Sequence, residues 1–522
     1  MPSAVGCPYM VRFKSLLCVS SLLLATLFLT SCTLKRPCPL CTGGGGGGGG
    51  STTGVTATLA AVPLAPPAGT NILSFVVTIT GVSLTPSGGG SAVNLNLPAT
   101  SVTVDLMRLE SDSTLLGQAL SVPAATYSKV SVSVSSVAVT YCTQVSPGTP
   151  GCSAGSVQQV AQAATVPAAS SFSLIVSSGQ VAGLQVQVNL ANAITLSPTQ
   201  PQVVSAVNLN ASNVLTASVL PPAASSLASG QLDFIEDFTG IVTNVNATSQ
   251  VLTIQTATRG TITATANSST FFSPNCTSPP FNSTADIHCV VANDIASVDV
   301  ALDANGSFTL LDYDPLDTTA SDWIEGVVML LPTSNTQFQI VANDLFQPSS
   351  GSLVGTKLPL GSTVTLNLST SPGATFGVDE RGLIVPAEAN TFVSANDTSV
   401  LRAGQTVAVH LSTFTAASGS TPATATVDFV GLRFTRVTAS VSSVAAPTSV
   451  SLASGSLPSF FGQTGIETAE LNLASAPSTA PTNYDGIGSG TGLVVGDTVS
   501  IRALYFGPIS AMPFTCAKVR KH

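Results

Sequence analysis

Residues that could perform acid–base chemistry are scarce in this sequence. It contains three histidines, His288, His410 and His522, at widely separated positions. A Ser–His–Asp arrangement would have to use His288 or His410, and no G-x-S-x-G motif surrounds a candidate nucleophile. His410 follows an alternating segment and is predicted to lie on the surface of a strand, while His288, beside Cys289, is predicted to be structural. We therefore predict no catalytic residue and no enzyme; a hydrolase would need one of these histidines in a cleft beside a serine and an aspartate.

The densest group of acidic residues is a second place where chemistry could occur. Asp312, Asp314 and Asp317 lie close together, with Tyr313 between the first two, and Asp322 follows. Carboxylates and backbone carbonyls of a loop can hold Ca²⁺, but this spacing does not follow an EF-hand loop. We interpret the stretch as a solvated loop between modules, and we predict neither a metal nor a cofactor.

Aromatic side chains make up 5% of the residues, and Trp323 is the single tryptophan. Binding surfaces often present Trp and Tyr rings, which combine an apolar face with a polar edge. Trp323, Tyr313 and the pair Phe271 and Phe272 are candidates for such a surface, although isolated aromatic residues in strands usually pack into a core. The candidate binding residues are therefore Asp312, Tyr313, Asp314, Asp317 and Trp323.

Ten cysteines suggest disulfide chemistry. Cys142 and Cys152 flank a turn rich in Pro and Gly, and Cys276 and Cys289 flank another loop. We predict that each pair forms a local disulfide, as an oxidising compartment allows. Cys516 is left without an obvious partner. A zinc site is not expected, because the histidines are scattered and these four cysteines are already assigned.

The N-terminal segment resembles a bacterial export signal. Arg12 and Lys14 precede an apolar run, residues 16–30, which is shorter than the roughly 20 residues that a helix needs to span a bilayer. The run leads into Leu-Thr-Ser-Cys at 29–32, which resembles a lipobox. That resemblance implies a signal peptide over residues 1–31 and a diacylglycerol on Cys32; the alternative is an ordinary secretory signal with a chance cysteine.

The residues after Cys32 indicate a flexible tether, which we place at 32–54. Thr33, rather than Asp, favours sorting to the outer membrane by resemblance to lipoproteins of Gram-negative bacteria. Eight glycines at 43–50 have great backbone freedom and no side chains to pack. A phosphate-binding loop would need a preceding strand and a following GK[ST] motif, and both are missing. Cys38 and Cys41 form a C-x-x-C motif in this tether, which we interpret as a small disulfide loop rather than a redox site.

Composition limits the function further. The chain has 522 residues, of which 44% are hydrophobic and 8% are charged, whereas an average soluble protein has about 25% charged residues. The formal net charge is −9, and no basic cluster of the kind that neutralises phosphates stands out beyond the signal region and the extreme C-terminus. We therefore predict no nucleic-acid partner. A small acidic cluster, Asp233, Glu236 and Asp237, is interpreted as solvated.

Alternating hydrophobicity runs through the sequence after the tether. Residues 130–134, 184–188 and 364–368 each alternate apolar residues with Ser, Thr, Gln or Asn. This period of two is typical of half-buried strands, and Gly- and Pro-rich turns separate the runs. The sequence therefore predicts an all-β protein with a domain at 55–220 and a linker at 221–231.

The first domain resembles a bacterial family, the domain of unknown function numbered 4382. The resemblance rests on 79–82, 104–107, 122–127 and the closing stretch 184–196. At Ala125 the family typically has Gly in its turn. The resemblance implies a β-sandwich and brings no known catalytic residue.

The rest of the chain is internally repetitive. Strands that follow a glycine recur after Gly361, Gly404 and Gly496, and each unit is expected to open with a hairpin, at 240–245, 326–329 and 437–441. The pattern resembles small barrel modules of another uncharacterised family, numbered 5666, which are similar to OB-type barrels. We predict two or three antiparallel barrels and place them as follows: 232–320, 321–436 and 437–522.

Together these features predict a non-catalytic lipoprotein of the cell envelope. It would be attached to the membrane through its N-terminal lipid and would act as a structural, adhesive or carbohydrate-interacting component. Its expected partners are an envelope polysaccharide or protein. The alternative is a ligand- or solute-binding lipoprotein that serves a transporter or a secreted enzyme complex and has a pocket between its modules.

Overall fold

The computed structural model describes most of the chain after the glycine-rich tether. The described residues are 53–521, without 66, 147, 221–233, 274–275, 277–285, 304–305, 318–321, 332–333, 348–350, 379–388, 446–447, 458, 467, 472–481, 486, 488 and 508–513. The predicted signal peptide, Cys32, Cys38, Cys41, the tether up to residue 52 and the linker at 221–231 lie outside them. Within the described part, no helix combines the length and the apolar character needed to cross a membrane.

The N-terminal domain is a β-sandwich, as predicted. One sheet has the order β13 (Leu215–Leu220), β10 (Val181–Asn189), β1 (Gly54–Val62) and β5 (Thr114–Ala119). The other contains β3 (Val93–Leu95), β2 (Thr70–Pro86), β6 (Ala125–Thr143) and β7 (Gln158–Gln162), with β4 (Val102–Asp105), β8 (Ala168–Ala169) and β9 (Leu174–Val176) beside them. A single hydrophobic core contains residues from both sheets, for example Val186 of β10 and Phe75 of β2.

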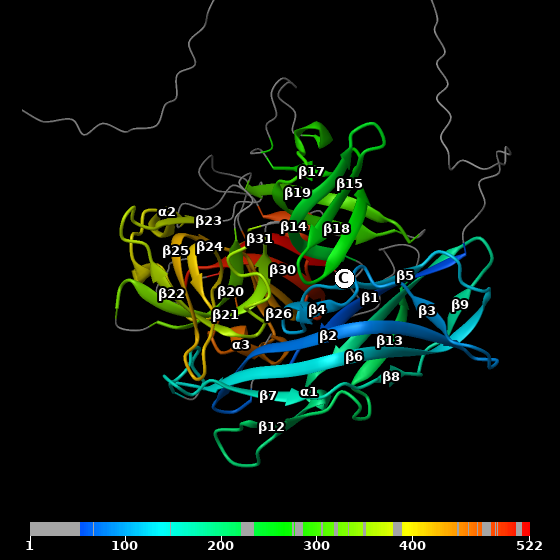
Figure 1. Ribbon diagram of the computed structural model, residues 1–522, viewed down its shortest axis with the longest axis horizontal. Helices are drawn as coiled ribbons and strands as arrows, with labels where there is room; N and C mark the ends of the chain where they lie inside the picture. Colours follow the sequence, from blue (N-terminus) through cyan, green and yellow to red (C-terminus); the bar gives the residue numbers. More distant parts are fainter. Residues whose placement is uncertain are drawn as a thin grey trace, which may run out of the picture. The chain divides into compact units, whose positions relative to one another are not determined.

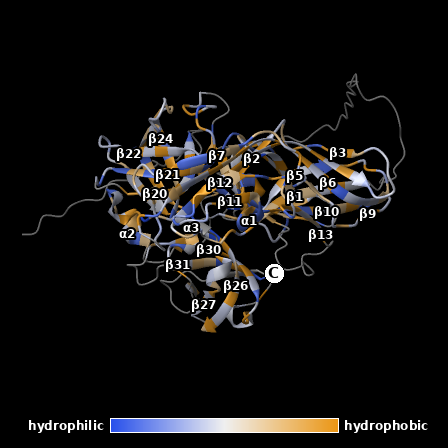
Figure 2. Cartoon of the chain, turned by 90° about the horizontal axis from the view of Figure 1, so that it is seen from below, coloured by the Kyte–Doolittle hydropathy of each residue, from blue (hydrophilic) through white to orange (hydrophobic). Residues whose placement is uncertain are grey.

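The long strands β2 and β6 pair along almost their whole length (Figure 1). Val130, Val132 and Val134 of β6 are buried, whereas the serines between them are partly exposed. This alternation places the apolar side chains on the core face, and the change in hydropathy along the strands can be followed in Figure 2. The register shifts at several points between β2 and β6, and such bulges increase strand twist.

Three closed barrels follow the sandwich within the described residues. The first consists of β14 (Phe234–Asn246), β15 (Val251–Thr256), β16 (Gly260–Thr265), β18 (Ile295–Leu302) and β19 (Phe308–Asp317). The second consists of β20 (Trp323–Leu330), β21 (Gln337–Phe346), β22 (Thr363–Leu368), β24 (Thr406–Thr415) and β25 (Ala423–Leu432). The third consists of β26 (Thr435–Ala445), β27 (Ser449–Leu452), β28 (Thr468–Leu471), β30 (Thr498–Tyr505) and β31 (Phe514–Lys521).

All three barrels have one topology. In each, the first strand pairs with the second and the fourth, and the ring closes through a parallel pairing of the third strand with the fifth. A short additional strand, β17 (Phe271–Phe272), β23 (Thr375–Val378) or β29 (Asn483–Asp485), pairs in parallel with the fifth strand. A five-stranded barrel of this kind is the OB type, so the predicted fold class is confirmed.

The third barrel begins slightly earlier than the expected start at residue 437. Thr435 and Arg436 already pair with Ala503 and Arg502 of β30. The start of β26 is therefore set by its pairing with β30, a strand about 60 residues away, and local sequence alone does not reveal it.

Two of the three repeated glycines precede equivalent strands of their barrels, and the third, Gly361, does not. Gly404 and Gly496 precede the fourth strands of their barrels, at φ +93° and +92°. Gly361 instead precedes β22, a third strand. In the first barrel the corresponding position before β18 is Asn293, at φ +79°. Asn tolerates this left-handed conformation better than most residues, so the chain can turn there without glycine.

Candidate functional site

The acidic stretch that we interpreted as a solvated loop is strand β19, so that prediction is wrong. Tyr313 is fully buried and Asp314 is 5% exposed. Asp312 and Tyr313 pair with Asp299 and Val298 of β18. The side chain of Asp317, at the end of β19, lies outside the described residues. Barrel closure buries Tyr313 and Asp314, because β19 pairs with strands on both sides.

Trp323 lies on a different barrel from these residues. It begins β20, is partly buried, and contacts the ring of His410 at 5.4 Å and that of Phe429 at 5.6 Å between centroids. Trp323 and Leu316 of the first barrel both pack against one small apolar cluster, which contains Ile295, Phe346 and Ala408. Phe271 is 44% exposed, whereas Phe272 is buried. The aromatic candidates therefore do not gather into one exposed strip.

The two histidines considered for catalysis each pair with an aspartate. His288 Nδ1 lies 3.0 Å from Asp286 Oδ1, and both side chains are about half exposed. His410 Nδ1 contacts Asp428 Oδ1 on the surface of the second barrel. Among the described residues, no serine hydroxyl is a hydrogen-bond partner of His410.

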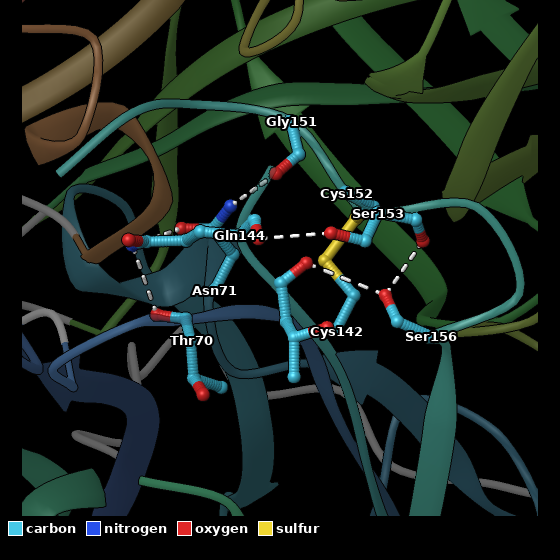
Figure 3. The surroundings of a disulfide bond; sticks show 9 residues. Thr70, Asn71, Cys142, Gln144, Gly151, Cys152, Ser153 and Ser156 are labelled. Atoms are coloured by element: carbon cyan, nitrogen blue, oxygen red, sulfur yellow. Dashed lines mark hydrogen bonds between the residues drawn. A yellow bond between two sulfur atoms is a disulfide. The ribbon is translucent and has the colours of Figure 1, made fainter. Parts of the chain in front are cut away.

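Both predicted disulfides are present. Cys142 pairs with Cys152, and Cys276 pairs with Cys289. Figure 3 shows how polar contacts hold the loop of the first disulfide: Asn71 Nδ2 donates to the Gly151 carbonyl, and Ser153 Oγ donates to the Gln144 carbonyl. Cys516 is buried and forms no disulfide within the described part of the chain, and burial raises the pKa of its thiol.

The first disulfide lies where the sandwich meets the second barrel. The Cys152 amide donates to the Met329 carbonyl at 3.0 Å. Both cysteines belong to a small apolar cluster with Leu73, Met329 and Phe460. The disulfide therefore fixes a loop that belongs to an interface between modules.

Further contacts between modules involve glycine turns of the barrels. Gly260, at φ +85°, lies against Pro98 of the sandwich, and a Cβ atom there would approach the Pro98 backbone to 2.6 Å. Gly306, at φ +79°, accepts a hydrogen bond from Thr56 Oγ1 of β1 at 3.1 Å. Thr140 Oγ1 of β6 donates to the Gly361 carbonyl at 2.9 Å. Glycine is needed at these turns because the backbone both adopts positive φ and approaches another module.

A network of buried ion pairs lies at the junction of the modules. Arg108 of the sandwich lies 2.8 Å from Glu325 Oε1 and 3.3 Å from Asp344 Oδ2, both of the second barrel. Arg108 also donates to the Asp237 carbonyl of the first barrel. Arg259 of the first barrel pairs with Asp344 at 2.7 Å. One arginine of the sandwich thus contacts two barrels.

The third barrel joins the same network through its own basic residues. Arg502 of β30 pairs with Asp299 of β18 and with Glu236 of β14. Arg436 of β26 pairs with Glu236 and Asp237. Glu236 and Asp237 are 6% and 3% exposed, so the interpretation of this cluster as solvated is wrong. Their partners lie in a distant part of the sequence and meet them through the fold; Asp233 lies outside the described residues.

Three arginines of the junction also lie over aromatic rings. The guanidinium carbon of Arg259 lies 4.8 Å from the centre of the Phe238 ring. Arg433 lies over Phe346 and Arg520 over Phe234. Such contacts stabilise a desolvated guanidinium, because the ring face is electron-rich.

The acidic groups of the junction respond differently to burial. Burial by itself would raise the pKa of Glu236, but Arg502, Lys518 and Arg436 outweigh it and lower the pKa to about 2. Burial raises the pKa of Asp112 to about 6, against the opposing effects of Arg436 and Arg108. Burial likewise raises the pKa of Asp105 to about 6, although the Phe75 and Met107 amides donate to this carboxylate. Asp105 and Asp112 therefore hold a proton more tightly than ordinary aspartates do, whereas Glu236 stays ionised.

Sequence reasoning did not single out the arginines of this junction. Charged residues form 8% of the chain, and several of them interrupt apolar strands, such as Arg502 within β30. A charged residue at a buried strand position is an available signal, because such a residue needs a partner of opposite charge.

In the part of the chain that the structure describes, these features define an all-β protein of four modules, a sandwich and three OB-type barrels, joined by a buried charged junction. Residues 65–211 match the model of a family described as "Domain of unknown function (DUF4382)". This match covers most of the sandwich and confirms the resemblance stated for it. The search of curated proteins found no match.

Proposed function

We propose that this chain is a non-catalytic, lipid-anchored protein of the cell envelope whose four β-modules act as one rigid structural or adhesive unit. The observation that carries the proposal is the buried junction. A chain with few charged residues places many of them between modules, where Arg108 alone contacts residues of two barrels. Buried ion pairs between modules specify one arrangement of the modules relative to each other. A structural or surface-displayed component needs such a fixed arrangement.

The lipobox supports the anchoring half of the proposal. Several acyl chains on Cys32 would hold the protein firmly, since each buried CH₂ contributes about 0.8 kcal/mol. The two disulfides agree with an oxidising compartment. Outer-membrane sorting is part of the proposal through Thr33, and an envelope polysaccharide or protein is the proposed partner. The common topology of the barrels supports kinship with the family numbered 5666.

The first test of the proposal is fractionation of cells that express the full chain. Cys32→Ser should move the protein from the membrane fraction to the soluble fraction, because the lipid can no longer be attached. Cys18→Ser, a matched change within the apolar run, should leave the protein in membranes. A Cys32→Ser protein that still sediments with membranes would contradict the lipid anchor.

The second test addresses the partner. Purified protein would be incubated with isolated envelope polysaccharides and with envelope proteins, and retained material would be identified. Retention of a polysaccharide would support the carbohydrate branch, and retention of a protein alone would support the adhesive or structural branch. Saturable binding of a small solute by the purified protein would instead favour the solute-binding alternative.

A further inference from the structure

A small cavity lies at the meeting point of the sandwich, the second barrel and the third barrel. Its volume is about 100 Å³, far below the several hundred Å³ of a typical drug-sized site. At about 30 Å³ for each water, it has room for a few waters or a ligand of a few heavy atoms. Its charged and amide side chains are Asp105, Arg108, Glu110, Glu325, Asn343 and Arg436, and hydroxyl side chains complete the polar lining.

Most of the charge around the cavity is already paired. Arg108 contacts Glu325 and Asp344, and Arg436 contacts Glu236 and Asp237. Glu325 is shared between Arg108 and Arg433. Asp105 differs from these groups: it is 1% exposed, and its described hydrogen bonds come from two backbone amides. The cavity therefore offers a buried carboxylate whose bonds come from neutral donors.

Two other polar atoms of the lining residues are available to form hydrogen bonds with a ligand. The buried Oδ1 atom of Asn343 has no hydrogen-bond partner among the described residues. The buried Nε atom of Arg108 also has no hydrogen-bond partner among the described residues, since the Asp112 carboxylate lies 4.0 Å from it, beyond hydrogen-bond distance. An acceptor and a donor are thus both available. Because a buried polar atom without a hydrogen bond destabilises the structure, a ligand that satisfies both atoms would be favoured.

The chemistry of the lining favours an ammonium group over a bare metal ion. The described residues contain no group of three or more His, Cys, Asp or Glu side chains placed to hold a metal. Phe434, Phe460 and Phe461 also line the cavity, and aromatic rings contact cations favourably. An ammonium donates directional hydrogen bonds to a carboxylate and an amide oxygen, which matches Asp105 and Asn343.

We propose that this cavity binds a small primary amine that carries a hydroxyl group or another acceptor, with Asp105 as its counter-ion. The ammonium group donates to Asp105 and to Asn343 Oδ1. The acceptor of the ligand receives the Arg108 Nε–H. Binding joins residues of the sandwich and the second barrel, so it also strengthens their interface.

Calorimetric titration of the purified full chain with ethanolamine at pH 7.5 tests the proposal. Saturable binding is expected, and ethylene glycol, which lacks the ammonium group, should not bind. Sodium chloride at equal ionic strength should not compete. Absence of ethanolamine binding, or equal binding of ethylene glycol, would overturn the proposal.

Two variants and one matched control locate the site. Asp105→Asn should weaken ethanolamine binding at least tenfold, while its amide oxygen still accepts the two backbone amides. Asn343→Leu should also weaken binding and provides an independent variant if the first fails to fold. Asp322→Asn removes another buried carboxylate, which accepts hydrogen bonds from Ser352 Oγ and the Leu353 amide and does not line the cavity, and it should leave the affinity within threefold. Equal losses in Asp105→Asn and Asp322→Asn would show that the loss of any buried carboxylate, rather than this site, is responsible.

The pH dependence provides a further readout. The charged groups that line the cavity with Asp105 are Arg108, Glu110, Glu325 and Arg436. With a pKa of about 6, Asp105 is largely ionised at pH 7.5 and about one-tenth ionised at pH 5. Ethanolamine affinity should therefore fall about tenfold between these pH values. An affinity that is unchanged at pH 5 would contradict the role of Asp105.

Discussion

Single buried side chains dominate the junction of the modules. Asp112 is fully buried, so its carboxylate has no contact with solvent. It accepts hydrogen bonds from the Ser113 and Glu236 amides. Arg108 Nε lies 4.0 Å from Asp112 Oδ2. Asp112 therefore combines a structural role as an acceptor with an electrostatic cost as a buried anion.

The raised pKa of Asp112 predicts a pH dependence of stability. Its folded-state pKa of about 6 exceeds its ordinary value of 3.8, so the folded protein holds this proton more tightly than the unfolded chain does. Its contribution to the free energy of unfolding is present below pH 4 and is lost as the pH rises through 6. Asp105 contributes in the same direction.

Denaturant titrations at pH 5 and pH 7.5 measure this contribution. The part lost between these pH values is at most about 1.4 kcal/mol, because the folded pKa of about 6 lies one unit above pH 5 and one pKa unit corresponds to about 1.4 kcal/mol. Asp112→Asn should reduce the loss of stability between pH 5 and 7.5, because the amide does not titrate and still accepts both backbone amides. Lys129→Met, a change of charge in β6 of the sandwich away from this cluster, is the control. An Asp112→Asn protein with the same pH dependence as the wild type would refute the assignment.

At the scale of elements, the turns of the barrels determine how the modules meet. Gly260 at the start of β16 and Gly419, between β24 and β25, both have positive φ. Gly260 lies against Pro98, whereas nothing lies within 4 Å of a Cβ atom at Gly419. Substitution at Gly419 therefore measures only the cost of positive φ. Substitution at Gly260 adds the steric clash of Cβ with Pro98.

Alanine substitutions at these glycines should have different effects. Gly419→Ala should cost about 1–2 kcal/mol, the usual cost of a left-handed non-glycine residue. Gly260→Ala should cost more, since Cβ must also displace the Pro98 backbone of the sandwich. Thermal unfolding of both variants measures the difference. Equal losses of stability would mean that the contact between Gly260 and Pro98 does not matter.

At the scale of the whole molecule, the junction makes the four modules depend on one another. Arg108 contacts Glu325 and Asp344 of the second barrel and the Asp237 carbonyl of the first barrel. Removing one partner of a buried ion pair typically costs about 3–5 kcal/mol, because the remaining charge is uncompensated. The loss should spread beyond the sandwich that carries Arg108.

Arg108→Met tests this dependence. The variant should unfold at a lower denaturant concentration, with a broader transition or separate transitions, since the modules no longer stabilise one another. Lys357→Met, a change at an exposed lysine, is the matched control for loss of positive charge and should be nearly neutral. Unchanged unfolding of Arg108→Met would show that the modules are joined by packing alone.

Much of the fold could be predicted from particular local patterns. The alternation at residues 130–134 predicts a strand because a period of two places every apolar side chain on one face. The spacing of Cys142 and Cys152 about a turn predicts their disulfide, because the chain between them can return on itself. The motifs at Gly404 and Gly496 predict repeated barrels, since the same turn precedes the same strand in each.

The candidate site could not be predicted in the same way. Glu236 and Arg502 are separated by most of three barrels, and their pairing depends on how the closed barrels pack. The acidic sequence at Asp312 and Asp314 predicts a solvated loop, whereas β19 pairs with β18, Asp314 is buried and Asp312 is partly buried. By itself the sequence determined the strands, the local disulfides and the repeats, because each depends on residues close together in the chain. Only the tertiary structure decided which charges meet and where a cavity remains, because burial and ion pairing depend on contacts between distant segments.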